Sequence, residues 1–261
     1  MTDRSESLRA ILRTRTPTVA TFVMLPRIEI VEMLGLAGFD AVVLDLEHGP
    51  IGVGDLTGLA AASRAVGIHA IARLPEGRPA TIAAALDAGV DGVMVPHVSS
   101  GEVARDAVRA SRFPPDGQRS LNPYVRGTAY DGSTSEAIIS VNDANAVICM
   151  VEGTDGLADL DSVLSTDGLD AVFIGPVDLS AALGHPGQPD HPQVLLEIES
   201  IFSRAADAGV ACGVYAPSPD RASTWFDFGA TLVAVSADAA MVLDAFRAIR
   251  GSVNTSKASA R

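Results

Sequence analysis

The chain has 261 residues, of which 48% are hydrophobic and only 5% aromatic, with 24 glycines and a formal net charge of −13. This charge argues against nucleic acid and anionic membrane surfaces as partners, because binding to phosphates needs a basic face. The length suits one barrel domain or two small domains, and the aliphatic composition favours a parallel β-sheet covered by helices.

Eight short apolar runs recur along the chain, and each is typical of a buried strand. They cover residues 19–25, 41–46, 69–74, 92–96, 146–151, 171–175, 210–216 and 231–236. Amphipathic, helix-like stretches between them cover residues 29–37, 56–66, 79–88, 102–110, 157–164, 193–208 and 237–249. Repeated strand–helix alternation predicts an α/β fold, a (β/α)8 TIM barrel, as a single domain over residues 1–251.

The segments that connect the expected helices and strands also contain typical turn and loop patterns. Gly38, Gly89, Gly209 and Gly229 each stand between a helix and the next strand, where a left-handed residue is expected to end the helix. The stretch 111–145 is longer and reads as an irregular loop, which on a barrel is typical of a lid or an interface. Residues 1–8 and the polar tail 252–261 are expected to be flexible ends.

The distribution of lysine restricts the chemistry. Lys257, in the polar tail, is the only lysine of the chain. A Schiff-base aldolase needs a lysine that is desolvated inside a pocket, so we expect no Schiff-base lysine and no covalent route. Carbonyl chemistry on this chain would instead need a metal ion or an oxyanion hole.

The two cysteines, Cys149 and Cys212, lie within apolar runs and are expected to be buried, reduced thiols. The chain does not open with a secretory signal pattern, and no apolar run approaches the length of a membrane span. The sequence therefore predicts a cytoplasmic enzyme.

Polar residues follow the expected strands at the end where barrel enzymes carry their chemistry. Those that this rule selects are Asp45, Glu47, His48, Arg73, His97, Glu152 and Asp178. Carboxylates, imidazoles and a guanidinium from five strands are thus expected to meet on one face of the barrel. This convergence predicts an enzyme active site.

Glu152 and Asp178 follow neighbouring strands, so both carboxylates can reach one cation, in the manner typical of Mg²⁺ or Mn²⁺ sites. A simple helix N-cap is the alternative for Asp178. The segment Gly175, Pro176, Val177 and Asp178 opens a helix, whose N–H groups suit a carboxylate.

Arg73 ends a buried strand and needs an anionic partner there. That partner is either Asp45 or Glu47, or an enolate or carboxylate of the substrate. His48, beside Glu47 and Asp45, is a candidate general base. His97 is interpreted as a loop residue or a wall of the site, and the other histidines as structural.

These residues carry a family resemblance. The stretches 38–50, 72–75, 86–96, 112–115, 151–152 and 173–183 (FIGPVDLSAAL) resemble, in order, the HpcH/HpaI aldolase family. This family comprises metal-dependent (class II) pyruvate aldolases such as 4-hydroxy-2-oxoheptanedioate and 2-dehydro-3-deoxyglucarate aldolases, together with macrophomate synthase. Its members serve in the catabolism of aromatic or sugar acids.

The resemblance implies reversible aldol cleavage of a 4-hydroxy-2-oxo acid to pyruvate and an aldehyde through a metal-bound pyruvate enolate. It implies Mg²⁺, Mn²⁺ or Co²⁺ on Glu152 and Asp178, with no nucleotide cofactor. Val177 and Asp178 would bind the pyruvate carboxylate through their backbone N–H groups. Arg73 would stabilise the enolate, and His48 would transfer a proton.

The resemblance also implies a homo-oligomer, a hexamer built as a trimer of dimers. Asp87 matches a family aspartate that pairs with the catalytic histidine. In the expected barrel, however, Asp87 precedes a strand and lies at the opposite end of its own subunit, so it would act only across a subunit interface.

Four positions depart from the family pattern on the aldehyde side of the pocket, namely Phe22, Ser120, Met150 and Gly153. Because of these departures, the sequence does not identify the aldehyde acceptor. Alternative functions on the same barrel are an oxaloacetate decarboxylase, which needs the same enolate stabilisation, and a CoA-thioester lyase, for which the chain shows no basic cluster. A catalytically silent scaffold is a third alternative.

Overall fold

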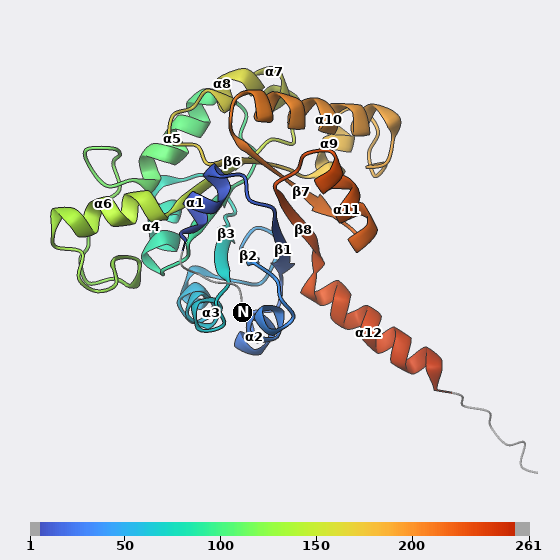
Figure 1. The fold of residues 1–261 in the computed structure, drawn as a ribbon, viewed down its shortest axis with the longest axis horizontal. Helices are drawn as coiled ribbons and strands as arrows, with labels where there is room; N and C mark the ends of the chain where they lie inside the picture. The colour runs from blue at the N-terminus through green and yellow to red at the C-terminus, as the bar shows by residue number, and fades with distance from the viewer. Residues whose placement is uncertain (1–5, 254–261) are drawn as a thin grey trace, which may run out of the picture.

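The structure, a computed structural model that describes residues 6–253, is a closed barrel of eight parallel strands in the order β1 to β8 (Figure 1). The strands are β1 (Thr18–Val23), β2 (Ala41–Asp45), β3 (His69–Arg73), β4 (Gly92–Val95), β5 (Ala146–Met150), β6 (Ala171–Ile174), β7 (Ala211–Ala216) and β8 (Leu232–Ala237). The predicted TIM barrel is confirmed, and all eight strands lie within a few residues of their expected positions.

Helices surround the barrel. They are α1 (Leu8–Arg13), α2 (Ile28–Leu36), α3 (Val53–Ala65), α4 (Pro79–Asp87), α5 (Gly101–Ser111), α6 (Ser135–Ala144), α7 (Thr154–Ala158), α8 (Leu160–Leu164), α9 (Pro176–Ala182), α10 (Pro192–Asp207), α11 (Pro219–Asp227) and α12 (Asp238–Ser252), with a 3-10 turn η1 (Arg126–Thr128). The four turn glycines predicted before strands all have positive φ angles, between 73° and 105°, as a helix C′ position requires.

Two expectations, on the connection 111–145 and on the N-terminal end, are wrong, and one helix was not predicted. The stretch 111–145 is not irregular throughout, because it contains η1 and α6. Helix α11 was not expected, although Ser218 caps it and Pro219 begins it. The N-terminal end is ordered from Ser7, whose hydroxyl caps α1, so the flexible end cannot extend to Leu8. Residues 1–5 and 254–261, including Lys257 and most of the predicted tail, lie outside the described residues.

The buried apolar side chains form two clusters, and one of them fills the interior of the barrel. Strand side chains alternate between the two faces of a sheet, so Ala41, Val43 and Asp45 of β2 point inward while Val42 and Leu44 point outward. Small inward residues, mostly alanine, occupy the lower layers of the barrel. Leu8 and Leu12 of α1 fill the space that these alanines leave, and α1 thereby closes the bottom of the barrel.

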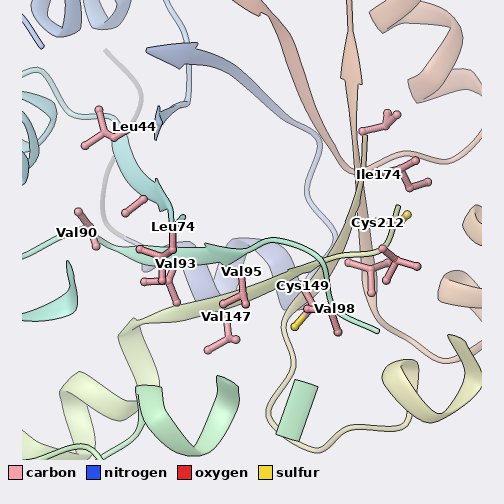
Figure 2. Close-up of a cluster of buried hydrophobic side chains, with 14 of the residues drawn as sticks. Leu44, Leu74, Val90, Val93, Val95, Val98, Val147, Cys149, Ile174 and Cys212 are labelled. Atoms are coloured by element: carbon pink, nitrogen blue, oxygen red, sulfur yellow. The ribbon is translucent and has the colours of Figure 1, made fainter. Parts of the chain in front are cut away.

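The second cluster lies between the strands and the helices. Figure 2 shows part of it, with Leu44, Val93, Val95, Val147 and Ile174 among the outward side chains. Cys149 and Cys212 belong to this cluster and are buried free thiols, as predicted. Burial raises the pKa of Cys149 to about 12, so its thiol stays protonated at neutral pH. Among residues 6–253 no helix is long and apolar enough to cross a membrane.

Candidate active site

The alternation of side chains decides which residues reach the mouth of the barrel. Asp45 and Arg73 are register partners at the carboxyl ends of β2 and β3, and both continue the inward-facing series of their strands. Met150 continues the inward series of β5, and Glu152 follows it two residues later. Because side chains alternate along each strand, the predicted residues at the strand ends face inward and lie together at the mouth of the barrel.

Asp45 and Arg73 form a bidentate ion pair. Arg73 Nε lies 3.0 Å from Asp45 Oδ1, and Arg73 Nη2 lies 2.5 Å from Asp45 Oδ2. The Asp45 side chain is completely buried and also accepts hydrogen bonds from the backbone N–H groups of Glu47 and His48. Arg73 contacts both of the carboxylates that the sequence offered as its partner, because its Nη1 atom also lies 3.3 Å from Glu47 Oε2. The guanidinium also stacks on the Phe22 ring at 4.6 Å.

A chain of charged contacts continues from Arg73 across the mouth. Glu47 Oε1 lies 3.0 Å from His97 Nε2, and His97 Nδ1 lies 3.2 Å from Glu152 Oε1. The backbone N–H of His97 donates to the same Glu152 oxygen at 3.3 Å. Residues from the ends of β2, β3, β4 and β5 are thus joined side chain to side chain, from Asp45 to Glu152.

The part played by His97 was underestimated from the sequence, where loop and wall were the alternatives. His97 has a left-handed backbone, with φ of 54°, which is unusual for a residue other than glycine. This conformation places one ring nitrogen against each of two glutamates. The available sequence signal was its position directly after β4, at the catalytic end of the barrel.

Glu152 has one oxygen without a partner. The residue is 4% exposed, and its buried Oε2 atom has no hydrogen-bond partner among the described residues. Burial raises the pKa of Glu152, and the negative charges of Asp178 and Glu47 raise it further, although the contacts with His97 act in the opposite direction. A buried carboxylate that faces other carboxylates is a site that a cation would stabilise.

Gly175 keeps the space between the two predicted ligands open. A Cβ atom at this position would lie 2.6 Å from Glu152 Oε2 and 3.6 Å from Asp178 Oδ2, so both oxygens border the same small space. Asp178 is the third residue of α9, and its side chain makes no N-cap hydrogen bond, since the N-cap position is Gly175. No group of three or more His, Cys, Asp or Glu side chains in residues 6–253 is arranged to hold a metal. Glu152 and Asp178 supply two carboxylates beside one space, and this donor set fits a divalent cation whose remaining ligands are water and substrate oxygens.

A cavity of about 230 Å³ opens beside these residues, in the centre of the barrel mouth. Its polar walls are Asp45, His48, Arg73, Asp178 and Tyr215, and Phe22 and Phe173 are among its apolar walls. The volume is below the range of about 300–1,000 Å³ that is typical for drug-sized ligands, so the cavity suits a small molecule. Gly175, Pro176 and Val177 also line it, which places the start of α9 against whatever the cavity binds.

His48 lies at the rim of the cavity. Its side chain is 65% exposed, and its Nε2 atom lies 4.0 Å from Glu47 Oε2. The ring is therefore held loosely and is accessible to both solvent and the cavity.

Some predicted residues lie elsewhere. Asp87 ends α4 at the opposite end of the barrel, where its carboxylate pairs with Arg119 at 2.6 Å, so the chain does not bring it to its own site. His69 begins β3, also at that end. His185 and His191 stack on each other at 3.5 Å in the loop before α10.

Gly175 provides a direct test of whether Glu152 and Asp178 hold a cation. Replacement of Gly175 with alanine is expected to weaken Mn²⁺ binding at least tenfold, because the new methyl group occupies the space beside Glu152 Oε2. The φ angle of −95° at this position suits alanine, so the fold should be retained. Mn²⁺ affinity is measured by electron paramagnetic resonance on the protein without substrate.

The matched control is Gly153→Ala. Gly153 is also an extended N-cap glycine at the mouth, but a Cβ atom there meets nothing within 4 Å. This variant should bind Mn²⁺ as the unchanged protein does. Equal affinities for the two variants would show that the space beside Glu152 does not hold the cation.

Comparison with known proteins agrees with the fold. The sequence profile of the HpcH/HpaI aldolase/citrate lyase family matches residues 19–245. The chain is 38% identical over 217 residues to a 5-keto-4-deoxy-D-glucarate aldolase of Salmonella paratyphi C, an alignment that covers 83% of each chain.

Two solved structures are similar over nearly the whole chain. An HpcH/HpaI aldolase/citrate lyase family protein from Burkholderia cenocepacia has a TM-score of 0.88 and 32% identity, with 94% of this chain and 97% of that chain covered. An HpcH/HpaI aldolase from Desulfitobacterium hafniense has a TM-score of 0.89 and 27% identity, with 96% and 99% covered. The chain belongs to the HpcH/HpaI aldolase/citrate lyase family and is a carbon–carbon lyase of the aldolase type.

Proposed function

We propose that this aldolase cleaves a 4-hydroxy-2-oxo acid to pyruvate and an aldehyde, and that a divalent cation held by Glu152 and Asp178 is required. The observation that carries the proposal is the unpartnered, buried Glu152 oxygen, which borders the same space as Asp178 beside a cavity lined by Arg73. The relatives named 5-keto-4-deoxy-D-glucarate aldolase support a substrate of this class.

The cation, which is Mg²⁺, Mn²⁺ or Co²⁺, would supply Lewis-acid polarisation of the substrate's keto group. The start of α9 would bind the substrate carboxylate, because the first N–H groups of a helix have no partner within the helix. In this proposal Val177 and Asp178 contribute those N–H groups, and Gly175 and Pro176 set the direction of the turn.

Arg73 is placed to stabilise the enolate oxygen of pyruvate. A guanidinium has five N–H groups, and those facing Asp45 and Glu47 account for three of them. Two remain for an oxygen in the cavity that Arg73 lines. Because Asp45 and Glu47 hold the guanidinium in place, it is positioned before negative charge develops on the substrate.

His48 would transfer the proton in this scheme, either directly or through a water molecule. Asp45 fixes the backbone of His48 through its hydrogen bond to the N–H group, and Glu47 lies near the ring. In cleavage, a base removes the proton of the C4 hydroxyl group; in the reverse direction, it removes a proton from the methyl group of pyruvate.

The proposal is tested with a racemic 4-hydroxy-2-oxo acid as substrate and lactate dehydrogenase to detect pyruvate. We expect pyruvate release that requires Mn²⁺ and stops in excess chelator. Borohydride added with pyruvate should leave no covalent adduct on the protein. Full activity in excess chelator, or a trapped adduct on Lys257, would overturn the metal-dependent scheme.

We also propose that the chain forms a homo-oligomer, in line with the hexamer that the resemblance implies. Helix α12 runs away from the barrel instead of packing along its wall (Figure 1). Leu243, Phe246 and Ile249 on this helix are 46–65% exposed and lie on one side of it. Helix α2 exposes Met33 and Leu36 as well, and a second copy of the chain, related by a two-fold axis, would cover both apolar surfaces at once.

Replacement of Phe246 with aspartate is therefore expected to shift the protein toward a smaller assembly, because the charge would be buried between copies. The measurement is light scattering coupled to size-exclusion chromatography. Ala248→Asp, on the opposite side of α12, is the matched control and should leave the mass unchanged. If both variants keep the mass of the unchanged protein, α12 is not part of the interface.

A cytoplasmic location completes the proposal. Cys149 and Cys212 are buried free thiols, which is the usual state of cysteines in a reducing compartment.

A further inference from the structure

The central cavity has two chemically different halves. The residues proposed to hold the cation and pyruvate come from the strand ends between β2 and β6. The remaining wall comes from β7, β8 and β1, which follow one another around the closed barrel. This wall consists of Tyr215, Ala237, Phe22 and Met24, and we refer to these four residues as the acceptor wall. Of the four positions expected on the aldehyde side, Phe22 lies in this wall, Met150 lines the cavity on the β5 side, and Ser120 and Gly153 do not line the cavity.

Aromatic packing fixes the acceptor wall. The Phe22 ring lies 6.2 Å from the Phe173 ring, edge to face, and 6.1 Å from the Tyr215 ring. Gly213 on β7 allows this arrangement, because a Cβ atom there would collide with the Phe173 ring. The surface that these rings present is rigid and apolar.

Met24 is held in place by its backbone. Its N–H group donates to the buried Asp238 carboxylate at 2.8 Å, so the chain after β1 is tied to the start of α12. The thioether side chain is the flexible part of the acceptor wall, and it can adapt to the shape of an apolar group.

The acceptor wall carries no charged side chain that could pair with an anionic group. The guanidinium that lines the cavity is that of Arg73. Arg73 already faces Asp45 and Glu47. The acceptor wall itself contributes one polar group, the Tyr215 hydroxyl, and burial raises the pKa of Tyr215, so this hydroxyl stays neutral.

We propose that the acceptor wall selects an aldehyde with an apolar alkyl or aryl group, so that the cleaved substrate is a 4-hydroxy-2-oxo acid with an apolar substituent at C4. The inference rests on the proposed function, which places pyruvate at the other half of the cavity. It differs from the sugar-acid substrate for which the curated relatives are named.

The chemical step is the same for any acceptor. In the direction of synthesis, the methyl carbon of pyruvate loses a proton and forms a bond with the aldehyde carbon. The aldehyde oxygen takes up a proton and becomes the C4 hydroxyl group. No electron acceptor or donor is needed, and the substituent on the aldehyde stays unchanged against the acceptor wall.

The test compares aldehydes of equal length with the full-length enzyme, Mn²⁺ and pyruvate. Propanal is paired with glyceraldehyde, which adds two hydroxyl groups, and butanal with succinic semialdehyde, in which a carboxylate replaces the terminal methyl group. We expect kcat/KM for aldol addition to be at least tenfold higher for the apolar member of each pair, within the range that apolar pockets reach against polar isosteres. Equal or reversed preference in either pair would overturn the inference.

A charge added to the acceptor wall should change this preference. Met24→Arg is expected to lower the ratio of kcat/KM for butanal to that for succinic semialdehyde at least tenfold. Leu196→Arg, which adds the same charge at a 64% exposed leucine on α10, should leave the ratio unchanged. Met24→Lys provides a second cationic variant if the arginine variant does not fold. A ratio unaffected by the cation at position 24 would place the acceptor elsewhere.

Deuterium exchange into the methyl group of pyruvate, without any aldehyde, separates the two proposals. If exchange occurs and the preference is reversed, only the acceptor wall inference fails. If pyruvate does not exchange at all, the proposed function fails.

Discussion

Replacement of Glu152 with glutamine is expected to abolish Mn²⁺ binding in the micromolar range and, with it, aldol cleavage. The change keeps the shape of the side chain but removes one of the two charges that face the cation. We expect binding to weaken at least a hundredfold, or about 2.8 kcal/mol at 1.4 kcal/mol per factor of ten. The affinity is measured by calorimetry and by electron paramagnetic resonance, and turnover by release of pyruvate.

The same substitution should not unfold the protein. In the absence of a cation, Glu152 is a buried carboxylate close to Asp178 and Glu47, and its burial raises its pKa. A neutral amide removes that repulsion, although it gives up the charged contact with His97. The melting temperature of the metal-free variant should therefore equal or exceed that of the unchanged protein.

Asp155→Asn is the matched control for Glu152. Asp155 lies at the same rim of the barrel, in the first turn of α7, and its side chain is exposed. Loss of its charge should change neither Mn²⁺ affinity nor turnover by more than about twofold, since an exposed charge near a site acts weakly. Equal losses in both variants would mean that Glu152 acts only through the overall negative charge of the rim.

Replacement of Arg73 with methionine is expected to lower kcat about 10²–10³-fold, the range found when one preorganised donor to a developing negative charge is removed. The substitution has a second effect, because Asp45 is completely buried and would lose its counter-ion. An uncompensated buried charge costs about 3–5 kcal/mol of folding free energy. Turnover and the free energy of unfolding must therefore both be measured.

The double variant Arg73→Met with Asp45→Asn separates these two effects. The neutral amide needs no counter-ion and can still accept the hydrogen bonds from residues 47 and 48. We expect the double variant to recover stability but not turnover. Arg78→Met, which removes an exposed arginine paired with Glu76, is the control and should affect neither quantity measurably. Recovery of turnover in the double variant would show that Arg73 serves the fold only.

His97→Ala should cost much less turnover than the loss of Arg73. His97 holds Glu47 and Glu152 in place but contacts no substrate atom in the proposed scheme, whereas Arg73 stabilises the enolate oxygen. Comparable losses for the two variants would contradict the roles proposed for them.

The fold follows from local features of the sequence. Short apolar runs, glycines between helix and strand, and repeated alternation are properties of neighbouring residues, and they correctly predicted eight strands and their order around the barrel. The sequence did not predict helix α1, because the contacts that stabilise this helix come from distant parts of the chain. Leu8 and Leu12 are buried only because alanines in several strands leave space at the bottom of the barrel.

The site was predictable where strand geometry alone decides the outcome. Asp45, Arg73 and Glu152 lie where the alternation of side chains places them. The link from Glu47 through His97 to Glu152 was not predictable, because it depends on the left-handed conformation of one loop residue. The direction of α12, which runs away from the barrel, was also not predictable, since an amphipathic pattern does not show which surface the helix will cover.

The proposed function requires that this chain forms the enolate of pyruvate with a cation on Glu152 and Asp178 and without a covalent intermediate. It is tested most directly by following the methyl protons of pyruvate in D₂O by NMR, with the metal-free protein and after addition of Mg²⁺ or Mn²⁺. We expect rapid exchange with the cation, none without it, and none in Glu152→Gln at micromolar cation concentrations. Exchange by the metal-free protein at the same rate would contradict it.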